Sequence, residues 1–152
     1  MEYIPRDLLI WEAFHPGYNN NRSDEMTCQS AGYLRELGFR VVSIKCDFFE
    51  SNFGDIIVSN IPFSLKKKVF ERLKALNKPF IVIAPALTLH TSYVRELFGK
   101  SLSIIIPQRR IYFDKRNPLT NKIETTKRAN FECCFYCYKV PSILPQRLLF
   151  SK

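Results

Sequence analysis

The stretch that decides the fold of this chain is Asp55-Ile56-Ile57-Val58-Ser59-Asn60-Ile61-Pro62-Phe63-Ser64. Its β-branched run, residues 56–58, predicts a short buried strand. Pro62 cannot donate to a β-ladder and restricts Ile61 to an extended conformation, so the chain is expected to leave the sheet in a stiff turn. Asn60 and Phe63 should therefore lie at the carboxyl end of a central strand, which is the edge where open α/β sheets bind ligands.

Apolar runs and amphipathic runs alternate along most of the chain, a pattern typical of a doubly wound α/β sheet. We expect strands at 8–11, 39–44, 56–58, 80–85 and 102–106, and helices at 29–37, 65–76 and 92–98. Gly38 is expected to end the first helix in a left-handed conformation. Ser64 is a suitable N-cap for the second helix, whose buried face is predicted by helical spacing: Leu65, Val69, Leu73 and Leu76.

Length and composition favour one globular domain over residues 1–152. Apolar residues make up 46% of the chain, which argues against disorder. There are 23 Lys and Arg against 14 Asp and Glu, and this basic balance suits a polyanionic partner such as nucleic acid. A merely soluble surface would have the same balance, so charge alone does not decide between them.

The sequence also predicts a location inside the cell. No apolar run approaches the roughly 18 residues of a membrane span, and the first residues lack the pattern of a secretory signal. Five cysteines are an odd count, so reduced thiols in an intracellular compartment are expected. Cys133, Cys134 and Cys137 lie in an expected strand, where alternate side chains face opposite sides, so we predict no metal site.

The strand followed by Asn60-Ile61-Pro62-Phe63 resembles motif IV of the amino-methyltransferases that use S-adenosylmethionine, (Asp/Asn/Ser)-Pro-Pro-(Tyr/Phe/Trp). The resemblance implies that the Asn60 side chain and the Ile61 carbonyl accept hydrogen bonds from the target amine, and that Phe63 stacks on a flipped base. Pro62 keeps the second proline of the motif, whereas Ile61 replaces the first. Taken alone, the same residues also suit an ordinary exit turn with Phe63 over the core.

Two further segments resemble the cofactor motifs of that family. Trp11-Glu12-Ala13-Phe14 is similar to a Trp-Glu-Pro-Phe variant of motif I in viral and phage members, which implies that Glu12, Phe14 and Gly17 bind the cofactor. Asp47-Phe48-Phe49 resembles motif III, which implies cofactor contacts for Asp47 and Phe48. The alternatives are a solvent-facing acid at Glu12, a turn acid at Asp47 and a core ring at Phe48.

Basic residues gather at two places that could meet phosphate. Lys66 and Lys67 begin the outward face predicted for the second helix, which also includes Lys68, Arg72 and Lys74. Arg109 and Arg110 precede aromatic residues, and such interleaving suits single-stranded nucleic acid. Solvated faces and core aromatics are the alternatives. Residues 108–116 and 130–138 are expected to form the antiparallel hairpin that closes a methyltransferase sheet.

The resemblance extends over residues 4–139 and implies a doubly wound, mostly parallel, Rossmann-like methyltransferase sheet with a closing antiparallel hairpin. The first hypothesis is an adenine-N6 methyltransferase of viral or phage type, with S-adenosylmethionine as cofactor and DNA rather than RNA as partner. One alternative is an inactive methyltransferase-like protein that binds nucleic acid. Another is a methyltransferase acting on RNA or on a protein glutamine. The oligomeric state stays open.

Overall fold

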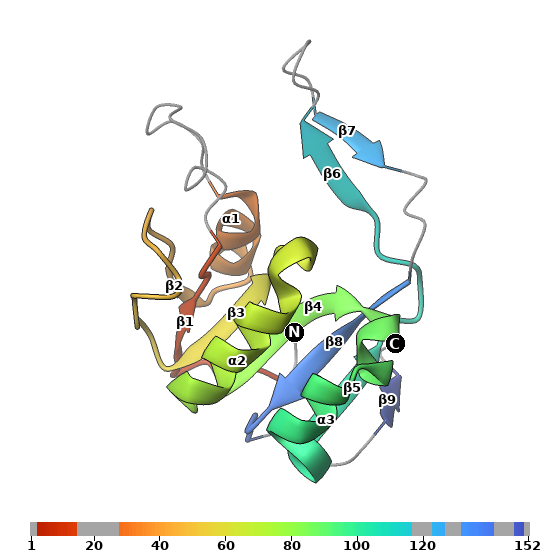
Figure 1. Cartoon of the computed structure of the whole chain (residues 1–152). Coiled ribbons are helices and arrows are strands. Elements are labelled where there is room, and N and C mark those ends of the chain that lie inside the picture. The colour runs from red at the N-terminus through yellow and green to blue at the C-terminus, as the bar shows by residue number, and fades with distance from the viewer. Residues whose placement is uncertain (1–2, 15–27, 117–122, 127–131, 142–147, 151–152) are drawn as a thin grey trace.

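The computed structural model describes residues 3–14, 28–116, 123–126, 132–141 and 148–150 (Figure 1). Strands of the main sheet follow the order β2-β1-β3-β4-β8-β5-β9. Their bounds are β1 Leu9–Trp11, β2 Arg40–Val42, β3 Ile56–Asn60, β4 Phe80–Pro85, β5 Leu102–Ile106, β8 Cys133–Tyr138 and β9 Leu148–Phe150. The α-helices are α1 Gln29–Glu36, α2 Lys66–Leu76 and α3 Ser92–Phe98, and short 3-10 turns are η1 Phe63–Leu65, η2 Ala86–His90 and η3 Gly99–Ser101.

The main sheet is parallel except at one strand. β2, β1, β3 and β4 pair in parallel, and β5 pairs in parallel with β9. Among the described strands of this sheet, β8 alone runs in the opposite direction, between β4 and β5. The expected fold class, a doubly wound and mostly parallel α/β sheet, is confirmed.

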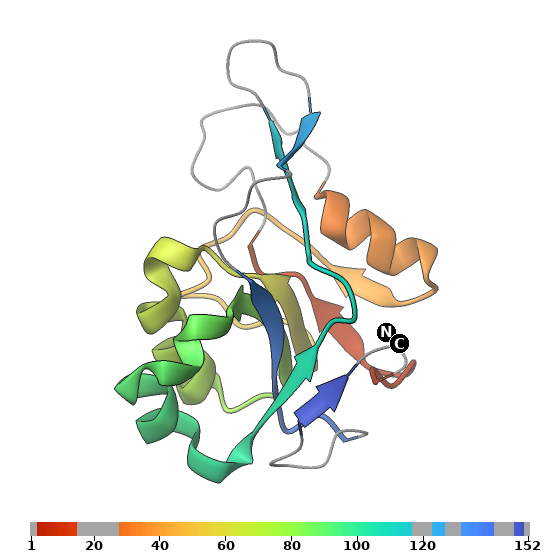
Figure 2. The same cartoon turned by 90° about the vertical axis from the view of Figure 1, so that its right-hand side faces the viewer.

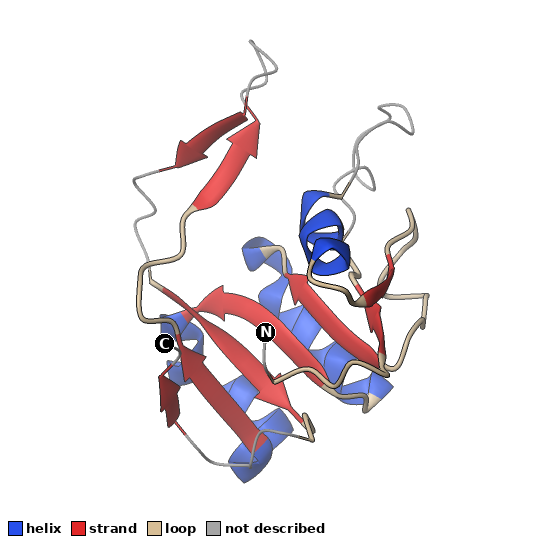
Figure 3. Cartoon of the chain, turned by 180° about the vertical axis from the view of Figure 1, so that it is seen from behind, coloured by secondary structure: helices blue, strands red, loops and turns tan. Residues whose placement is uncertain are grey.

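Helices cover both faces of the sheet, but unequally. α2 and α3 pack on one face, and α1 lies on the other, as the view from behind shows (Figure 3). The chain passes from β1 through α1 to β2 on one side of β1, whereas β3 lies on the other side. The strand order therefore reverses between β1 and β3, and such a reversal opens a crevice at the carboxyl ends of the strands.

The larger core cluster lies between the sheet and the helices α2 and α3. Phe70 is fully buried in it, with ring centroids 5.4 Å from Tyr136 and 5.9 Å from Phe98. A second cluster joins Leu34 of α1 to Ile10, Ile56 and other residues on the opposite face. The strands at 80–85 and 102–106, predicted from the sequence, supply residues to both clusters.

The expected details of α2 need correction. Ser64 lies within η1 and makes no capping hydrogen bond, because that 3-10 turn delays the start of the α-helix to Lys66. Leu65 is 39% exposed, while Phe70 is buried beside Val69 and Leu73. Gly38 adopts the expected left-handed conformation with φ of 85°.

The end of the chain is arranged differently from the expected hairpin. β8 pairs with β5 rather than with residues 108–116. Instead β6 Phe113–Arg116 pairs with β7 Ile123–Thr126 in a two-stranded ribbon that stands away from the main sheet (Figure 2). The reason is local: Pro107 lacks an N–H and is followed by exposed polar residues, so the buried ladder ends with β5.

Within the described residues, no helix is both long and apolar enough to cross a membrane. All five cysteines are free thiols, and the described residues contain no group of three or more potential metal ligands.

Candidate functional site

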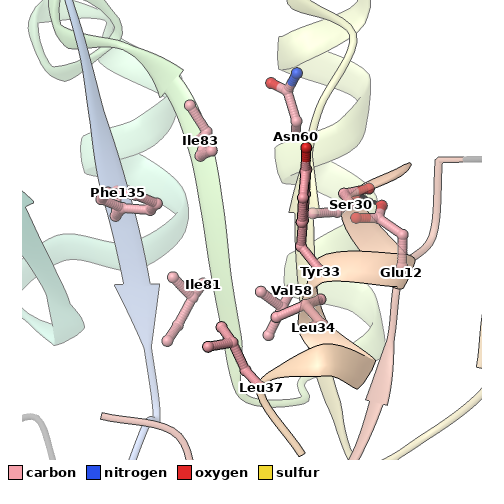
Figure 4. A pocket seen from close by; sticks show the side chains of 11 residues that line it. Glu12, Ser30, Tyr33, Leu34, Leu37, Val58, Asn60, Ile81, Ile83 and Phe135 are labelled. Atoms are coloured by element: carbon pink, nitrogen blue, oxygen red, sulfur yellow. Dashed lines mark hydrogen bonds between the residues drawn. The ribbon is translucent and has the colours of Figure 1, made fainter. Parts of the chain in front are cut away.

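The candidate site lies at the crevice between β1 and β3. Trp11 of β1 is in register with Ile57 of β3, so the residues that follow these positions reach the same edge of the sheet. Glu12 comes directly after β1, and Asn60 is the last residue of β3. Both line one pocket of about 190 Å³ (Figure 4). The structure thus brings together two of the predicted site residues that are far apart in sequence.

Glu12 is buried, at 2% exposure, which excludes the solvent-facing alternative. Its Oε1 accepts hydrogen bonds from the Ser59 hydroxyl and, at 3.3 Å, from the Phe14 amide. Ser30, in the first turn of α1, adds a side-chain hydrogen bond. Burial nevertheless raises the pKa of Glu12 above its ordinary value, because the three hydrogen bonds offset desolvation only in part. The carboxyl group is held in position but poorly solvated.

The rest of the pocket is mainly apolar. Strands β3, β4 and β8 supply Val58, Ile81, Ile83 and Phe135, and the α1 side supplies Tyr33, Leu34 and Leu37. Figure 4 shows Ile81, Ile83 and Phe135 on one side of the pocket, and Tyr33, Leu34 and Val58 with the polar residues Glu12, Ser30 and Asn60 on the other. A few polar groups on apolar walls are the usual composition of a ligand pocket.

The turn after β3 has the expected form. Pro62 has φ of −68° and precedes η1, whose Leu65 amide donates to the Pro62 carbonyl at 3.0 Å. Asn60 is exposed, whereas Ile61 is 2% exposed and packs in the main core. Phe63 is half-buried, and its ring lies 5.7 Å from that of Phe113 in an edge-to-face arrangement. The aromatic residue of the turn is thus in contact with the start of the ribbon.

Two of the other predicted cofactor residues, Phe14 and Phe48, belong to an aromatic cluster with Trp11 in the larger core cluster, on the α2 side of the sheet. Phe48 is 3% exposed, with ring centroids 4.6 Å from Phe14 and 5.5 Å from Trp11. Asp47 caps a turn, since its Oδ1 accepts from the Phe49 amide at 2.8 Å. Phe14, Asp47 and Phe48 do not line the pocket that Glu12 and Asn60 share. Gly17 lies outside the described residues.

The predicted phosphate-binding residues separate into exposed and engaged side chains. Lys67 and Arg109 are exposed, while Lys66 donates to the Phe63 carbonyl at 3.4 Å. Arg110 forms an ion pair with Glu132, Nε to Oε1, at 3.2 Å. The outward orientation expected for Arg72 is wrong, because Arg72 is half-buried and donates to the Ser51 carbonyl at 3.0 Å.

Three residues that line the pocket were not predicted as site residues: Ser30, Tyr33 and Phe135. Ser30 and Tyr33 belong to the helix expected at residues 29–37, and the polar start of that helix was the available signal. Phe135 enters because β8 is inserted beside β4, a pairing that no local pattern indicates.

The strand order is that of a known fold. A mostly parallel sheet whose strand order reverses between β1 and β3, with one antiparallel strand, β8, inserted between β4 and β5, has the class I methyltransferase fold. No protein-family model matches the chain, and no curated protein matches its sequence. A solved structure, precorrin-6y C5,15-methyltransferase from Geobacter metallireducens GS-15, is similar at 13% identity and a TM-score of 0.44, over 90% of this chain and 83% of that one. At those values the likeness adds no argument to the assignment.

Proposed function

We propose that this chain transfers a methyl group from S-adenosylmethionine to the exocyclic amino group of adenine in DNA. The observation that carries the proposal is the shared pocket of Glu12 and Asn60, which come from the two strands that flank the reversal of strand order. Ligands of open α/β sheets bind at that position. The motif-like turn after β3 supplies the reason to choose an amino group as the acceptor.

The residues of the pocket fit part of the cofactor. Glu12 is a buried acid, and its position suits a cationic group of a ligand. Ser30 and Asn60 add polar groups near it, and the remaining walls are apolar. S-adenosylmethionine would supply an electrophilic methyl group on a positively charged sulfur. Glu12 and Ser30 would hold its charged end.

The chain's own part in the reaction is alignment. The Asn60 amide oxygen and the Ile61 carbonyl oxygen would each accept a hydrogen bond from one N–H group of the amine, which leaves the nitrogen lone pair free to attack the methyl group. Phe63 would hold the ring that carries the amine. Apolar walls from β4 and α1 would exclude water from the reacting atoms.

A second candidate is a methyltransferase-like protein that binds nucleic acid without catalysis. Two predicted cofactor residues favour it: Phe48 is buried, and Asp47 accepts a hydrogen bond from a backbone amide. Neither side chain is positioned to contact an adenosine moiety. The pocket of about 190 Å³ is also smaller than most small-molecule sites, at roughly 300–1,000 Å³. RNA or a protein glutamine as acceptor would use the same Asn60 turn.

Calorimetric titration with S-adenosylmethionine and then with its demethylated product tests the proposal. We expect saturable binding that is weakened by Glu12→Gln and unchanged by Glu36→Gln, which alters an exposed acid on α1. A folded protein that binds neither ligand at millimolar concentration would exclude the enzyme and favour the second candidate. A positive result leads to a transfer assay on adenine-containing DNA.

A further inference from the structure

A short segment, residues 108–113, runs from β5 into the start of the ribbon, and we call it the neck. It begins one residue after Pro107, beyond the carboxyl end of β5. β3 runs parallel to β4, and β4 and β5 both run antiparallel to β8. β3 and β5 therefore point the same way and end at the same edge of the sheet. Three strand spacings separate them, or about 14 Å. The neck therefore leaves the sheet at the same edge at which β3 ends (Figure 2).

Two contacts hold the neck in place. At its middle, Arg110 Nε lies 3.2 Å from Glu132 Oε1 in an ion pair. The backbone carbonyl of Glu132 in turn accepts a hydrogen bond from the Ala86 amide at 2.8 Å. At its upper end, the Phe113 ring lies against Phe63 of the turn after β3. Arg110 joins the outgoing and returning legs of the chain, and Phe113 couples the neck to the predicted amine-binding turn.

Two side chains of the neck, Arg109 and Tyr112, are exposed to solvent. Tyr112 is 52% exposed, although it is a large aromatic residue. Arg109 is exposed and has no ion pair within the described part of the chain. Beside Arg109 and Arg110 lies a pocket of about 210 Å³ with mostly apolar walls, supplied by Ala86, Leu89, Ile104, Ile106, Pro107, Cys133 and Cys134.

We propose that the neck binds single-stranded DNA next to the target base, with Arg109 on a phosphate and Tyr112 stacked on an unpaired base. This assignment deepens the proposed function and rests on it for the position of the target base. A free cation beside an exposed ring is the combination that single strands require, since every base has a π-face and every linkage a negative charge. Duplex DNA would offer Tyr112 no unpaired base.

Charge along the chain supports a polyanion at this place. Between Pro107 and Phe131 the sequence has seven basic residues and two acidic ones. The acidic residues are Asp114 and Glu124, and Glu132, just beyond, is already paired. An acidic protein partner would satisfy the cations but would leave Tyr112 without a role. The exposed ring therefore favours nucleic acid.

Fluorescence polarisation with a labelled single-stranded DNA oligonucleotide, without cofactor, tests the proposal. We expect Tyr112→Ala to weaken binding about tenfold, and Tyr112→Phe to bind like the natural protein because it keeps the ring. Arg109→Ala should weaken binding and reduce the slope of log affinity against log salt by about 0.7. Arg95→Ala, an exposed arginine on α3, is the matched control and should leave that slope unchanged.

Several results would overturn the proposal: no binding of the oligonucleotide, equal affinity for Tyr112→Ala and the natural protein, or tighter binding of duplex than of single strands. Binding of a polyglutamate peptide as tightly as the oligonucleotide would also overturn it, because the neck would then be a general anion-binding surface. Because the assay contains no cofactor, failure to bind S-adenosylmethionine would remove the proposed reaction while a Tyr112-dependent affinity would still support the neck.

Discussion

Replacing Asn60 with alanine should separate catalysis from folding. The side chain is exposed at the end of β3, and within the described residues it has no hydrogen-bond partner. Its loss should therefore change the free energy of unfolding by less than about 0.5 kcal/mol. In the reaction the amine gains positive charge, so the hydrogen bond to Asn60 strengthens in the transition state. A hydrogen bond to a charged group contributes about 1.5–3 kcal/mol, which predicts a fall in kcat of roughly 10- to 150-fold.

The assay is transfer of labelled methyl groups to a single-stranded oligonucleotide that contains adenine. Thermal melting should show a shift in Tm of less than about 2 °C. Ser64→Ala, in the same turn and also exposed, is the control and should keep full activity. If Asn60→Ala keeps the kcat of the natural protein while it remains folded, Asn60 does not orient the amine and the site assignment is refuted.

Three further substitutions test the structure around the site. Glu12→Gln should raise Tm at neutral pH but not near pH 4. Because the pKa of Glu12 is raised in the folded protein, that state binds the proton more tightly, and stability falls as pH rises from the unfolded pKa through the folded pKa. Melting curves against pH should show this loss for the natural protein and not for the variant. Phe70→Ala should destabilise by about 3–5 kcal/mol in urea unfolding, because it removes a fully buried ring from the larger core cluster; a loss below about 1 kcal/mol would contradict the packing. Gly54→Ala should destabilise by at least about 1–2 kcal/mol, since φ is 61° and a Cβ would lie 2.7 Å from the Leu9 carbonyl oxygen, whereas Gly32→Ala in α1 should be neutral or stabilising.

Most of the sheet could be predicted because its strands are short apolar runs between strong boundary residues. The strands at 80–85 and 102–106 and the helix at 92–98 are confirmed with their bounds. Pairing beyond the local pattern could not be predicted in the same way. Of residues 108–116, expected as one strand of a closing hairpin, only 113–116 form a strand, and their partner is β7, in a stretch where no strand was expected. β9 was not predicted.

For the candidate site, position was predictable and packing was not. Parallel strands that end at the same edge bring Glu12 and Asn60 together whatever the side chains around them are. Whether Phe48 faces a ligand or the core depends on Trp11 and Phe14, which come from a different part of the chain. The same pattern of letters suits either arrangement, so only the assembled structure places the Phe48 ring in the core.

The position of β8 has a consequence for synthesis on the ribosome. β4 and β5 are not neighbours, and each obtains a partner on their shared side only when residues 133–138 have left the exit tunnel. Until then a nascent chain carries one apolar strand with a free edge, Phe80–Pro85, and one apolar strand without a partner, Leu102–Ile106. Unpaired edges of this kind invite pairing with other chains. Growing chains of this protein should therefore bind chaperones until their last quarter is made, and versions that stop before Cys133 should aggregate rather than fold.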